Sequence, residues 1–353
     1  MNPPKQRRPS RFGPALWLLA LGFLLAGIAV AMHLLPMLRA SRESGAVGDG
    51  ASVSSYGFDL EPCLIPANEI VATGLAKGAL PAMTHPPVLM PGEADSIGGA
   101  ERGKYMVSGD RVVGVVIGGA ARAYPLHVLA WHEVVNDTLG GEPIAVTYSP
   151  LSGGVIVFGR RVGDEVFRFG VSGLLYNSNL LMYDMGPGGA GESLWSQMMG
   201  VAVAGPRAGI GIEVLPSAVM AWGDWRARHP KTTVLGRDPR RVKAYKKDPY
   251  GNYFSSDLLR FPVSPMPPEG GAPLKSRVLA VRPGRDWVMF RFDEIGANAD
   301  GKGEWRTAAP GGTPLVLHYR KEPETAWALA GDPPTPVPSY QCFWFAWYAF
   351  RGE

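Results

Sequence analysis

The segment 122–158 constrains the fold more than any other part of this sequence. It predicts a short helix that begins at Pro125, because a proline at the first helical position lacks only an N–H that would be unpaired anyway. Apolar residues recur at helical spacing as far as residue 135. His132 and Glu133 are therefore expected in the middle of this helix.

A pair of strands is expected after the helix. Gly140 and Gly141 supply a turn, and the segment 143–148 is apolar and rich in β-branched residues, as strands are. The Pro/Gly/Ser loop 149–154 joins it to a second apolar run, 155–158. Polar side chains on a loop between buried strands are where functional sites usually form.

The composition agrees with this pattern. Of the 353 residues, 46 are glycine and 33 are proline, and only 19% are charged, which favours short strands and turns over long helices. A chain of this length can bury a large core, as one large domain or two smaller ones. We therefore predict an α+β, β-rich fold with short helices.

Residues 14–38 predict one N-terminal transmembrane helix. No residue from Pro14 to Met32 is charged, and the apolar run extends to Leu38, long enough to span about 30 Å of hydrocarbon. By the positive-inside rule the basic segment 1–13 stays in the cytoplasm, so the protein should be a single-pass inner-membrane protein with its main domain outside. A cleaved signal peptide is the alternative, but residues 38–40 form a poor cleavage site, which favours an uncleaved anchor.

The net charge of +4 comes from the N-terminal segment. Lys5, Arg7, Arg8 and Arg11 carry four positive charges, so the rest of the chain sums to about zero. A nucleic-acid-binding protein needs a basic patch on its folded part. The sequence therefore predicts no nucleic-acid partner.

The rest of the chain divides into a tether and an extracytoplasmic domain. Residues 39–57 are small and polar, as in flexible linkers. The domain should occupy residues 58–353, in halves of about 58–261 and 274–353 that a Pro/Gly linker joins.

An internal repeat supports these halves. Residues 111–115 (RVVGV) resemble residues 277–281 (RVLAV), and residues 140–148 resemble residues 311–319 in the same order. We therefore expect two pseudo-symmetric β-rich halves. Because the second copy lacks the His-Glu pair of the first, chemistry would reside in the first half.

The two cysteines, Cys63 and Cys342, lie near the two ends of the exported part. Exported proteins can keep disulfides, and a bridge here would close a long loop and contribute about 4–5 kcal/mol in the chain-entropy model. Two buried thiols are the alternative.

Six blocks spread from about residue 80 to about residue 350 carry a family resemblance. They are AYPLHVLAWHEVVND, VTYSPLSGGVIVF, FGVSGLLYNSNLLMYD, ESLWSQ, WGDWRARHPKTTVL and FWFAWYAF. In this order they resemble the DUF3179 family of bacterial proteins, whose function is uncharacterised. The resemblance implies kinship of fold and names no reaction. The matching positions are Tyr124-Pro125, Trp131-His132-Glu133, Asn136-Asp137, Asn177-Ser178, Asp184 and Trp195-Ser196-Gln197.

The chain departs from that family in one loop. Members commonly carry Cys-Pro-Leu-Cys-Gly where this chain has serines at Ser149 and Ser152. Two thiols at that spacing can bind a soft metal or cycle as a disulfide, whereas two hydroxyls do neither well. Thiol chemistry of the relatives is therefore in doubt for this protein.

His132 and Glu133 are the first candidates for chemistry, as a catalytic acid–base pair or, with His127, as ligands of a divalent metal. Residues five apart on a helix diverge by about 140°, so His127 and His132 would not share a face. Additional metal ligands would have to come from elsewhere, such as His85, Asp184 or His318. The alternative is a packed histidine that hydrogen bonds to a neighbouring loop.

The serines are candidates for a nucleophile. Ser149 or Ser152 would need a base, and the N–H groups of Gly153 and Gly154 could stabilise an oxyanion. The chain has no Gly-x-Ser-x-Gly motif at this loop. The alternative is a polar turn whose hydroxyls bond to the backbone.

Amide and hydroxyl groups beside tryptophan suit a polar small molecule, although they can equally satisfy buried backbone groups. The candidate ligand-binding residues are Tyr124, Ser149, Ser152, Asn177, Ser178, Asp184, Trp195 and Gln197. A basic set is a candidate for an anionic partner, with a solvated charged edge as the alternative. It consists of Arg237, Arg240, Arg241, Lys243, Lys246 and Lys247.

Two hypotheses of function follow. The first is a binding or accessory module of the cell envelope that holds a small ligand, a metal or a protein partner. The second is an enzyme that uses His132 and Glu133 in acid–base or metal-assisted chemistry. An enzyme should place perturbed titratable groups beside a water-accessible cleft, whereas a structural role would leave His132 buried and fully hydrogen-bonded. Loss of the cysteine pair favours binding.

Overall fold

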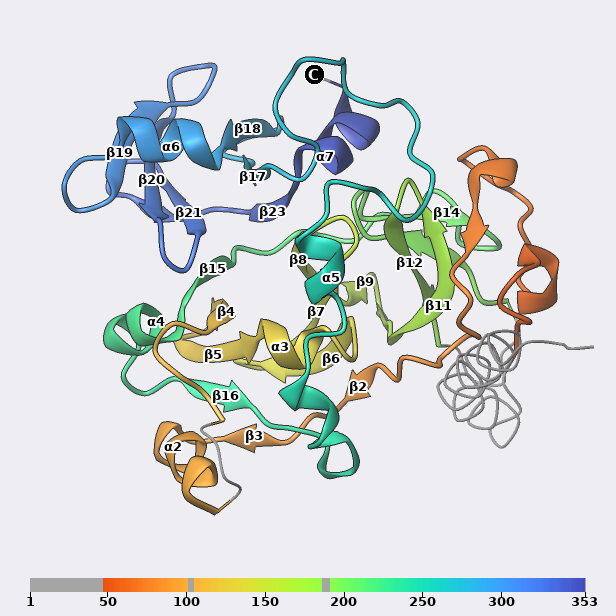
Figure 1. The fold of residues 1–353 in the computed structure, drawn as a ribbon, viewed down its shortest axis with the longest axis horizontal. Coiled ribbons are helices and arrows are strands. Elements are labelled where there is room, and N and C mark those ends of the chain that lie inside the picture. Colours follow the sequence, from red (N-terminus) through yellow and green to blue (C-terminus); the bar gives the residue numbers. More distant parts are fainter. Residues whose placement is uncertain (1–46, 101–104, 186–190, 353) are drawn as a thin grey trace, which may run out of the picture. The chain divides into compact units, whose positions relative to one another are not determined.

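The computed structural model describes residues 47–100, 105–185 and 191–352 (Figure 1). The predicted basic segment 1–13, the anchor 14–38 and residues 39–46 of the tether lie outside the described residues. The rest of the predicted tether, 47–57, is described, and Tyr56 within it is fully buried, so this part is packed on the domain. Within the described ranges, no helix combines the length and the apolar character needed to cross a bilayer.

The fold is β-rich with few short helices, as predicted, and a seven-stranded sheet is its largest element. The order of strands in this central sheet is β18 (Val288–Arg291), β17 (Arg277–Val281), β23 (Ser339–Phe343), β8 (Gly154–Gly159), β7 (Glu142–Ser149), β6 (Val134–Leu139) and β2 (Met83–Thr84). Strands from both predicted halves therefore share one sheet.

Three smaller sheets accompany the central sheet. The β11 sheet consists of β1 (Val71–Ala72), β11 (Phe169–Tyr176), β12 (Asn179–Asp184), β13 (Leu194–Ser196) and β14 (Val201–Ala204). The β4 sheet consists of β15 (Ala218–Ala221), β4 (Arg111–Ile117), β5 (Ala120–Pro125), β16 (Thr233–Leu235) and β3 (Val88–Leu89). The β20 sheet consists of β19 (Glu304–Ala308), β20 (Pro314–Arg320), β21 (Thr325–Ala330) and β22 (Thr335–Pro336). A small ribbon pairs β9 (Arg161–Val162) with β10 (Glu165–Val166).

The helices are short and mostly follow strands directly. The α-helices are α2 (Pro91–Ala100), α3 (Leu126–Leu129), α4 (Trp222–Arg228), α5 (Gly251–Phe254), α6 (Phe292–Asn298) and α7 (Trp344–Arg351). Single 3₁₀ turns are η1 (Val53–Tyr56), η2 (Ala67–Glu69), η4 (Pro239–Arg241) and η5 (Ala244–Lys246). Helix α4 follows β15 directly, and the linker 262–273 contains neither a helix nor a strand.

The central sheet is covered on both faces. Successive residues of a strand point to opposite faces of the sheet, so neighbouring residues show what covers each face. On β6, Val135 packs in a core cluster with Val113 of β4, whereas its neighbour Val134 packs in a second cluster with Phe169 of β11. The β4 and β11 sheets therefore cover opposite faces of the central sheet. A third cluster joins Leu279 of β17 to the β20 sheet.

The helix expected from Pro125 to residue 135 is much shorter than predicted. Helix α3 ends at Leu129, and β6 begins at Val134. The β-branched residues that follow the helix pair with β7, from Val134 opposite Thr147 onward, and this pairing overrides the helical spacing. His132 and Glu133 therefore lie in the turn between α3 and β6.

The predicted turn at Gly140-Gly141 is confirmed. These two residues link Leu139 to Glu142 across the β6–β7 hairpin, and both have positive φ, 58° and 88°. A two-residue hairpin turn of this kind requires positive φ at both positions, which glycine adopts without strain.

One order of elements occurs twice along the chain. Residues 111–159 form two strands, a helix and three strands, and residues 277–330 do the same. The strands are distributed differently, however. The first pair, β4 and β5, lies outside the central sheet, whereas β17 and β18 lie within it.

The predicted disulfide between Cys63 and Cys342 is absent, and both thiols are free. Cys342 is buried on β23 inside the central sheet, where burial raises the pKa of its thiol. The backbone of Cys63 forms an isolated β-bridge with Ala204 of the edge strand β14, and the Cys63 thiol donates to the carbonyl of Ile65 (3.1 Å). The two cysteines are held in different sheets. The alternative of two buried thiols holds for Cys342, whereas Cys63 is partly exposed.

Asn136 of β6 ties the central sheet to the β11 sheet. Its amide donates to the carbonyl of Phe169 and accepts from the N–H of the same residue, both at 2.8 Å. The side chain is fully buried. These two bonds fix the distance and register between β6 and β11.

Replacing Asn136 should therefore weaken the fold strongly. Asn136→Ala removes both bonds to Phe169 and leaves buried polar groups unpaired, which we expect to lower the free energy of unfolding by about 2–4 kcal/mol in urea denaturation. The matched control is Asn298→Ala, because Asn298 is exposed and makes one bond to Glu294. The control should change stability by less than about 0.5 kcal/mol, and equal losses in the two variants would contradict the role assigned to Asn136.

Candidate functional site

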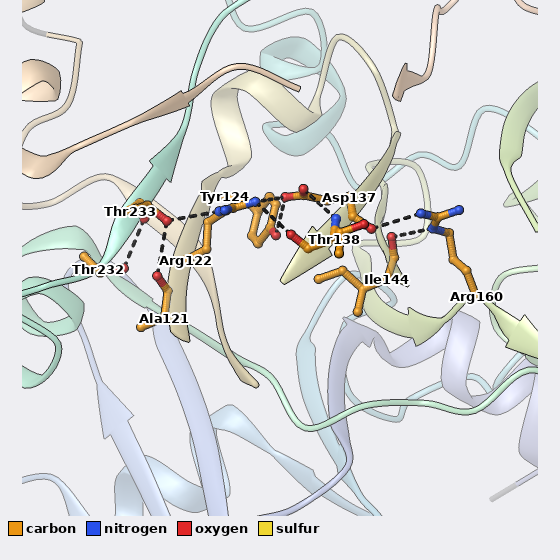
Figure 2. A network of polar contacts seen from close by, with 9 residues as sticks. All are labelled: Ala121, Arg122, Tyr124, Asp137, Thr138, Ile144, Arg160, Thr232 and Thr233. Atoms are coloured by element: carbon orange, nitrogen blue, oxygen red, sulfur yellow. Dashed lines mark hydrogen bonds and ion pairs between the residues drawn. The ribbon is translucent and has the colours of Figure 1, made fainter. Parts of the chain in front are cut away.

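Tyr124 belongs to a polar network between two sheets (Figure 2). Its hydroxyl donates to Asp137 (2.8 Å), and the Arg122 guanidinium donates to the same carboxylate oxygen. Burial, followed by the charge of Asp137, raises the pKa of Tyr124 well above its usual value. The network joins β5 of the β4 sheet to β6 of the central sheet, so the hydroxyl of Tyr124 is occupied by the fold.

Arg160 extends this network beyond Asp137 (Figure 2). Its buried guanidinium donates to the carbonyls of Ile144 (2.8 Å), Asp137 (3.0 Å) and Phe167. Guanidinium groups carry several donors in a fixed plane, and three carbonyl acceptors satisfy most of them here. The cation is therefore used to join backbone segments and is not directed at a ligand.

The hydroxyls of Ser149 and Ser152 are also hydrogen-bonded within the protein. The hydroxyl of Ser152 accepts from the Asn179 amide (2.8 Å), and the hydroxyl of Ser149 accepts from the N–H of Leu180 (3.2 Å). Both side chains are nearly fully buried. Among the described residues, no histidine or carboxylate hydrogen bonds to either hydroxyl, so the alternative of a polar turn describes this loop better than a nucleophile does.

Gln197 completes this buried network. Its amide donates to Thr147 (2.8 Å) and to the carbonyl of Gly154 (3.0 Å), and it accepts from Asn179 (2.7 Å). A Cβ at Gly154 would lie 2.8 Å from the Gln197 oxygen, so the glycine permits the close approach. The network joins the β11 sheet to the 149–154 loop.

Asn177 and Ser178 form the turn of the β11–β12 hairpin, with φ of 50° and 56°. The Asn177 amide donates to the carbonyl of Ser264 (2.9 Å) and accepts from its N–H (2.8 Å), and the Ser178 hydroxyl donates to Phe261 (2.8 Å). Both side chains therefore hold the segment that enters the 262–273 linker.

The remaining ligand-binding candidates are separate from these. Asp184 forms an ion pair with Arg207 (2.8 Å). Trp195 packs against Phe167 and Phe169, each with ring centroids 5.3 Å away, and its Nε1 has no hydrogen-bond partner in the described part of the chain. The eight predicted ligand-binding residues do not converge on one site, because long-range polar bonds within the fold occupy most of them.

His132 is a buried and fully hydrogen-bonded histidine. Its Nδ1 lies 2.7 Å from the carbonyl of Pro81, and its Nε2 lies 2.6 Å from the hydroxyl of Tyr245. A carbonyl only accepts, so Nδ1 carries the proton and Nε2 accepts from the tyrosine. Burial lowers the pKa of His132, which keeps the ring neutral. This geometry fits a structural role.

The structure does not bring the predicted metal ligands His127 and His132 together. His127 lies on α3 and packs edge-on against Tyr105, with ring centroids 5.7 Å apart. The two histidines line different cavities, and both ring nitrogens of His132 are already bonded, although His85 lines the same cavity as His132. Over the described residues, no three His, Cys, Asp or Glu side chains are grouped as a metal site requires.

Glu133 lines a third cavity, separate from those of the two histidines. The cavity has a volume of about 360 Å³ and lies against the β11 sheet. Its polar lining residues other than Glu133 are Thr73, Tyr250 and Arg260, and most of its wall is apolar. The apolar side chains are Leu75, Leu80, Leu151, Val171, Leu174, Leu175, Leu180 and Phe261.

The Glu133 carboxyl is electrostatically unusual. It is only 7% exposed, and burial raises its pKa from 4.5 to about 7, while a hydrogen bond from the Tyr250 hydroxyl (2.8 Å) acts in the opposite direction. Its backbone has φ of +56°, which is strained for a residue with a side chain. Strained, desolvated acids of this kind concentrate at functional sites.

Tyr250 and Arg260 were not predicted from the sequence. They lie more than a hundred residues beyond Glu133 in the chain, between η5 and the linker, where no strand pattern points toward the site. The only local signal is a tyrosine in a Pro/Gly-bounded segment, which is too common to indicate a site. Chemically, the assembled group can exchange a proton near neutral pH or hold a positively charged or hydrogen-bond-donating group.

Comparisons with known proteins give a family and no activity. The family model described as "Protein of unknown function (DUF3179)" matches residues 77–353. No curated protein and no solved structure was found to match the chain. The matched residues include every lining residue of the Glu133 cavity except Thr73 and Leu75. This match covers most of the sequence, and the chain therefore belongs to the DUF3179 family.

Proposed function

We propose that this protein is a small-ligand-binding module of the cell envelope and that the ligand occupies the Glu133 cavity. The observation that supports this proposal is a buried carboxyl whose pKa is about 7, placed in the wall of an otherwise mostly apolar cavity of about 360 Å³. Ligand sites in proteins are commonly apolar concavities with a few directed polar groups.

The lining indicates the class of ligand. An apolar body would contact the leucine-rich wall, and a basic or hydrogen-bond-donating group would bond to Glu133. A cationic group would also supply the counter-charge that the carboxylate lacks. Charge-assisted hydrogen bonds are stronger than neutral ones, so an amine should be favoured over an alcohol of the same shape.

The stability of the fold supports a functional reason for Glu133. A buried acid with a raised pKa lowers stability at neutral pH, and positive φ adds a backbone cost of about 1 kcal/mol or more. A leucine or a glycine would avoid one or both costs. Residues that are unfavourable for folding persist where function requires them.

An acid–base enzyme is the second candidate, and the same pKa favours it. A group that titrates near neutral pH is suited to proton transfer. In this alternative Glu133 would be the catalytic residue, and His132 would act only as a structural residue because both of its ring nitrogens are bonded. Steady turnover of a bound compound, as opposed to reversible binding, would distinguish the two.

We further propose that residues 14–38 anchor the domain to the inner membrane, with the domain outside and a tether that begins at residue 39. The support is the uncharged run and the basic segment before it. We also propose that residues 111–159 and 277–330 derive from one duplicated unit, because both the sequence similarity and the order of elements recur. The two segments should then superpose strand for strand with the same hand.

Glu133→Gln should remove a pH dependence of stability. In the wild type the acid is neutral in both states below pH 4.5, and the free energy of unfolding falls as pH rises from 4.5 through about 7, by about 3 kcal/mol in total. The neutral amide keeps an acceptor for Tyr250, so the variant should be the more stable protein at about pH 8 and similar to the wild type at about pH 4.5.

Urea denaturation at several pH values measures this difference. The control is Glu142→Gln, which removes an exposed carboxyl from β7 and should leave the wild-type pH profile in place. If Glu133→Gln and the wild type lose the same stability between about pH 4.5 and about pH 8, the Glu133 carboxyl does not have the raised pKa.

A pair of simple compounds tests the proposed site. Benzylamine should bind to the full chain at least about ten times more tightly than benzyl alcohol at about pH 8, since only the amine forms a charge-assisted bond with Glu133. Glu133→Gln should abolish the preference, whereas Glu142→Gln should retain it. Calorimetry that shows no binding of either compound, or an unchanged preference in Glu133→Gln, would refute this site.

Reporter fusions test the proposed topology. A reporter that is active only outside the cytoplasm, fused after residue 353, should be active with the full chain and inactive when residues 1–38 are removed. A reporter that works only in the cytoplasm should give the opposite result. The mass of the purified fusion should equal that of the uncleaved chain, and a shorter product that begins near residue 40 would favour the signal-peptide alternative.

A further inference from the structure

A second cavity, distinct from the Glu133 cavity, lies between α3, β7 and the segment 245–249. Its volume is about 230 Å³. Its lining residues are Asp110, Arg111, Leu126, His127, Ala130, Tyr148, Tyr245, Lys246, Lys247, Asp248, Pro249 and Phe254. It shares no lining residue with the Glu133 cavity. Three of its side chains are cationic and two are acidic, which leaves it with a net positive charge.

Arg111 is an unpaired cation in this cavity. It is the first residue of β4 and is half-buried, and its guanidinium has no ion pair and no hydrogen bond to any residue that the structure describes. Arg111 also acts electrostatically on another arginine. The charge of Arg111 adds to burial in lowering the pKa of Arg277 to about 10, and Arg277 is itself paired with Glu324 (3.2 Å).

Tyr148 is the buried polar group of the cavity. The residue is only 6% exposed and lines the cavity near the end of β7. Its hydroxyl forms no hydrogen bond with another described residue. The hydroxyl itself is not among the fully buried atoms that lack a partner, so it reaches the cavity and can bond to a molecule there.

The charges of both arginines act on Tyr148. Burial is the largest influence on its pKa and raises it, and the charges of Arg111 and Arg277 oppose that rise. The hydroxyl therefore stays protonated at neutral pH and can donate a hydrogen bond. The protonated phenol of Tyr148 and the guanidinium of Arg111 both line the cavity, and together they are a set of donors that suits an acceptor with negative charge.

The acids in the cavity are partly engaged with the backbone. Asp110 accepts from the N–H of Val107 (2.8 Å), and Asp248 accepts from the N–H of Tyr250 (2.8 Å). Neither forms an ion pair with Arg111. They fix the two loops at the cavity edge and leave the guanidinium of Arg111 available.

The basic set predicted from the sequence is only partly used here. Lys246 and Lys247 line the cavity edge, and the carbonyl of Lys247 accepts from Trp131 (3.2 Å), which holds this segment over α3. Arg240 instead pairs with Asp238 (2.9 Å), and the Arg237 guanidinium lies 4.9 Å from the ring centre of Tyr105.

We infer that this cavity binds a small oxyanion, with Arg111 and Tyr148 as the direct donors and Lys247 at the rim. A carboxylate and a phosphate share the chemistry that this site recognises: adjacent oxygens that accept from a guanidinium fork and a phenol. The size of the cavity fits a single such group. The ligand is bound without any covalent step.

Thermal unfolding of the full chain with added inorganic phosphate tests the inference. At constant ionic strength, phosphate should raise the melting temperature saturably, because a ligand that binds only the folded state stabilises it by RT ln(1 + [L]/Kd). Arg111→Gln and Tyr148→Phe should each weaken the apparent affinity for phosphate about ten-fold or more. Tyr148→Phe keeps the ring that packs in the cavity and so guards against a folding defect.

Two controls separate this site from other effects. Lys243→Gln removes an exposed cation of the same basic segment that does not line the cavity, and it should leave phosphate binding unchanged. Glu133→Gln should also retain phosphate binding. A failure of the proposed ligand site at Glu133 can therefore be told apart from a failure of this inference. Sulfate and acetate in place of phosphate identify the source: a stronger effect of phosphate and sulfate indicates a tetrahedral oxyanion, and an equal effect of acetate indicates a carboxylate.

The inference would be overturned by either of two results. One is the absence of saturable stabilisation by phosphate, sulfate and acetate alike. The other is stabilisation of the same size and midpoint in wild type, Arg111→Gln and Tyr148→Phe, which would mean that the anions act by general screening.

Discussion

Two adjacent polar residues on β6 connect the three sheets that build most of this fold. Asn136 bonds to the backbone of Phe169 on one face of the central sheet, and Asp137 accepts from Arg122 and Tyr124 on the other. Because neighbouring residues of a strand point in opposite directions, one dipeptide can hold both covering sheets. Buried polar groups are destabilising unless paired, so these bonds also select one register among the many that apolar packing would allow.

The position of the candidate site follows from this arrangement. Glu133 lies just before β6, where the chain turns from α3 into the fixed strand, and its carbonyl accepts from the N–H of Tyr148 on β7 (2.8 Å). Glu133 and Tyr148 are thus joined by their backbones, and their side chains line two different cavities. One pair of strands therefore supports both cavities.

Several features were predictable because they depend on short-range geometry. Gly140 and Gly141 indicated the hairpin, and the apolar, β-branched runs 143–148 and 155–158 indicated strands. The helix through residue 135 was wrong, since pairing with β7 outweighs the helical spacing of a few apolar side chains. The ligand-binding set was misjudged for a different reason. A serine, an amide or a tyrosine has the same appearance in a sequence whether it faces a ligand or bonds to a carbonyl far along the chain, as Asn177 does with Ser264.

The sequence by itself determined the β-rich class, the family, and a short set of polar residues that includes Glu133. Composition, turn residues and apolar strand runs are local properties, and they can be recognised in the sequence without knowledge of any distant contact. Only the tertiary structure decided which polar residues are free to act. In the folded protein the ring nitrogens of His132 bond to Pro81 and Tyr245, and Cys63 and Cys342 lie in different sheets. Glu133 and Tyr148 line cavities. The physical reason is that burial and pairing depend on segments more than a hundred residues away, and these two quantities set the pKa and the availability of each group.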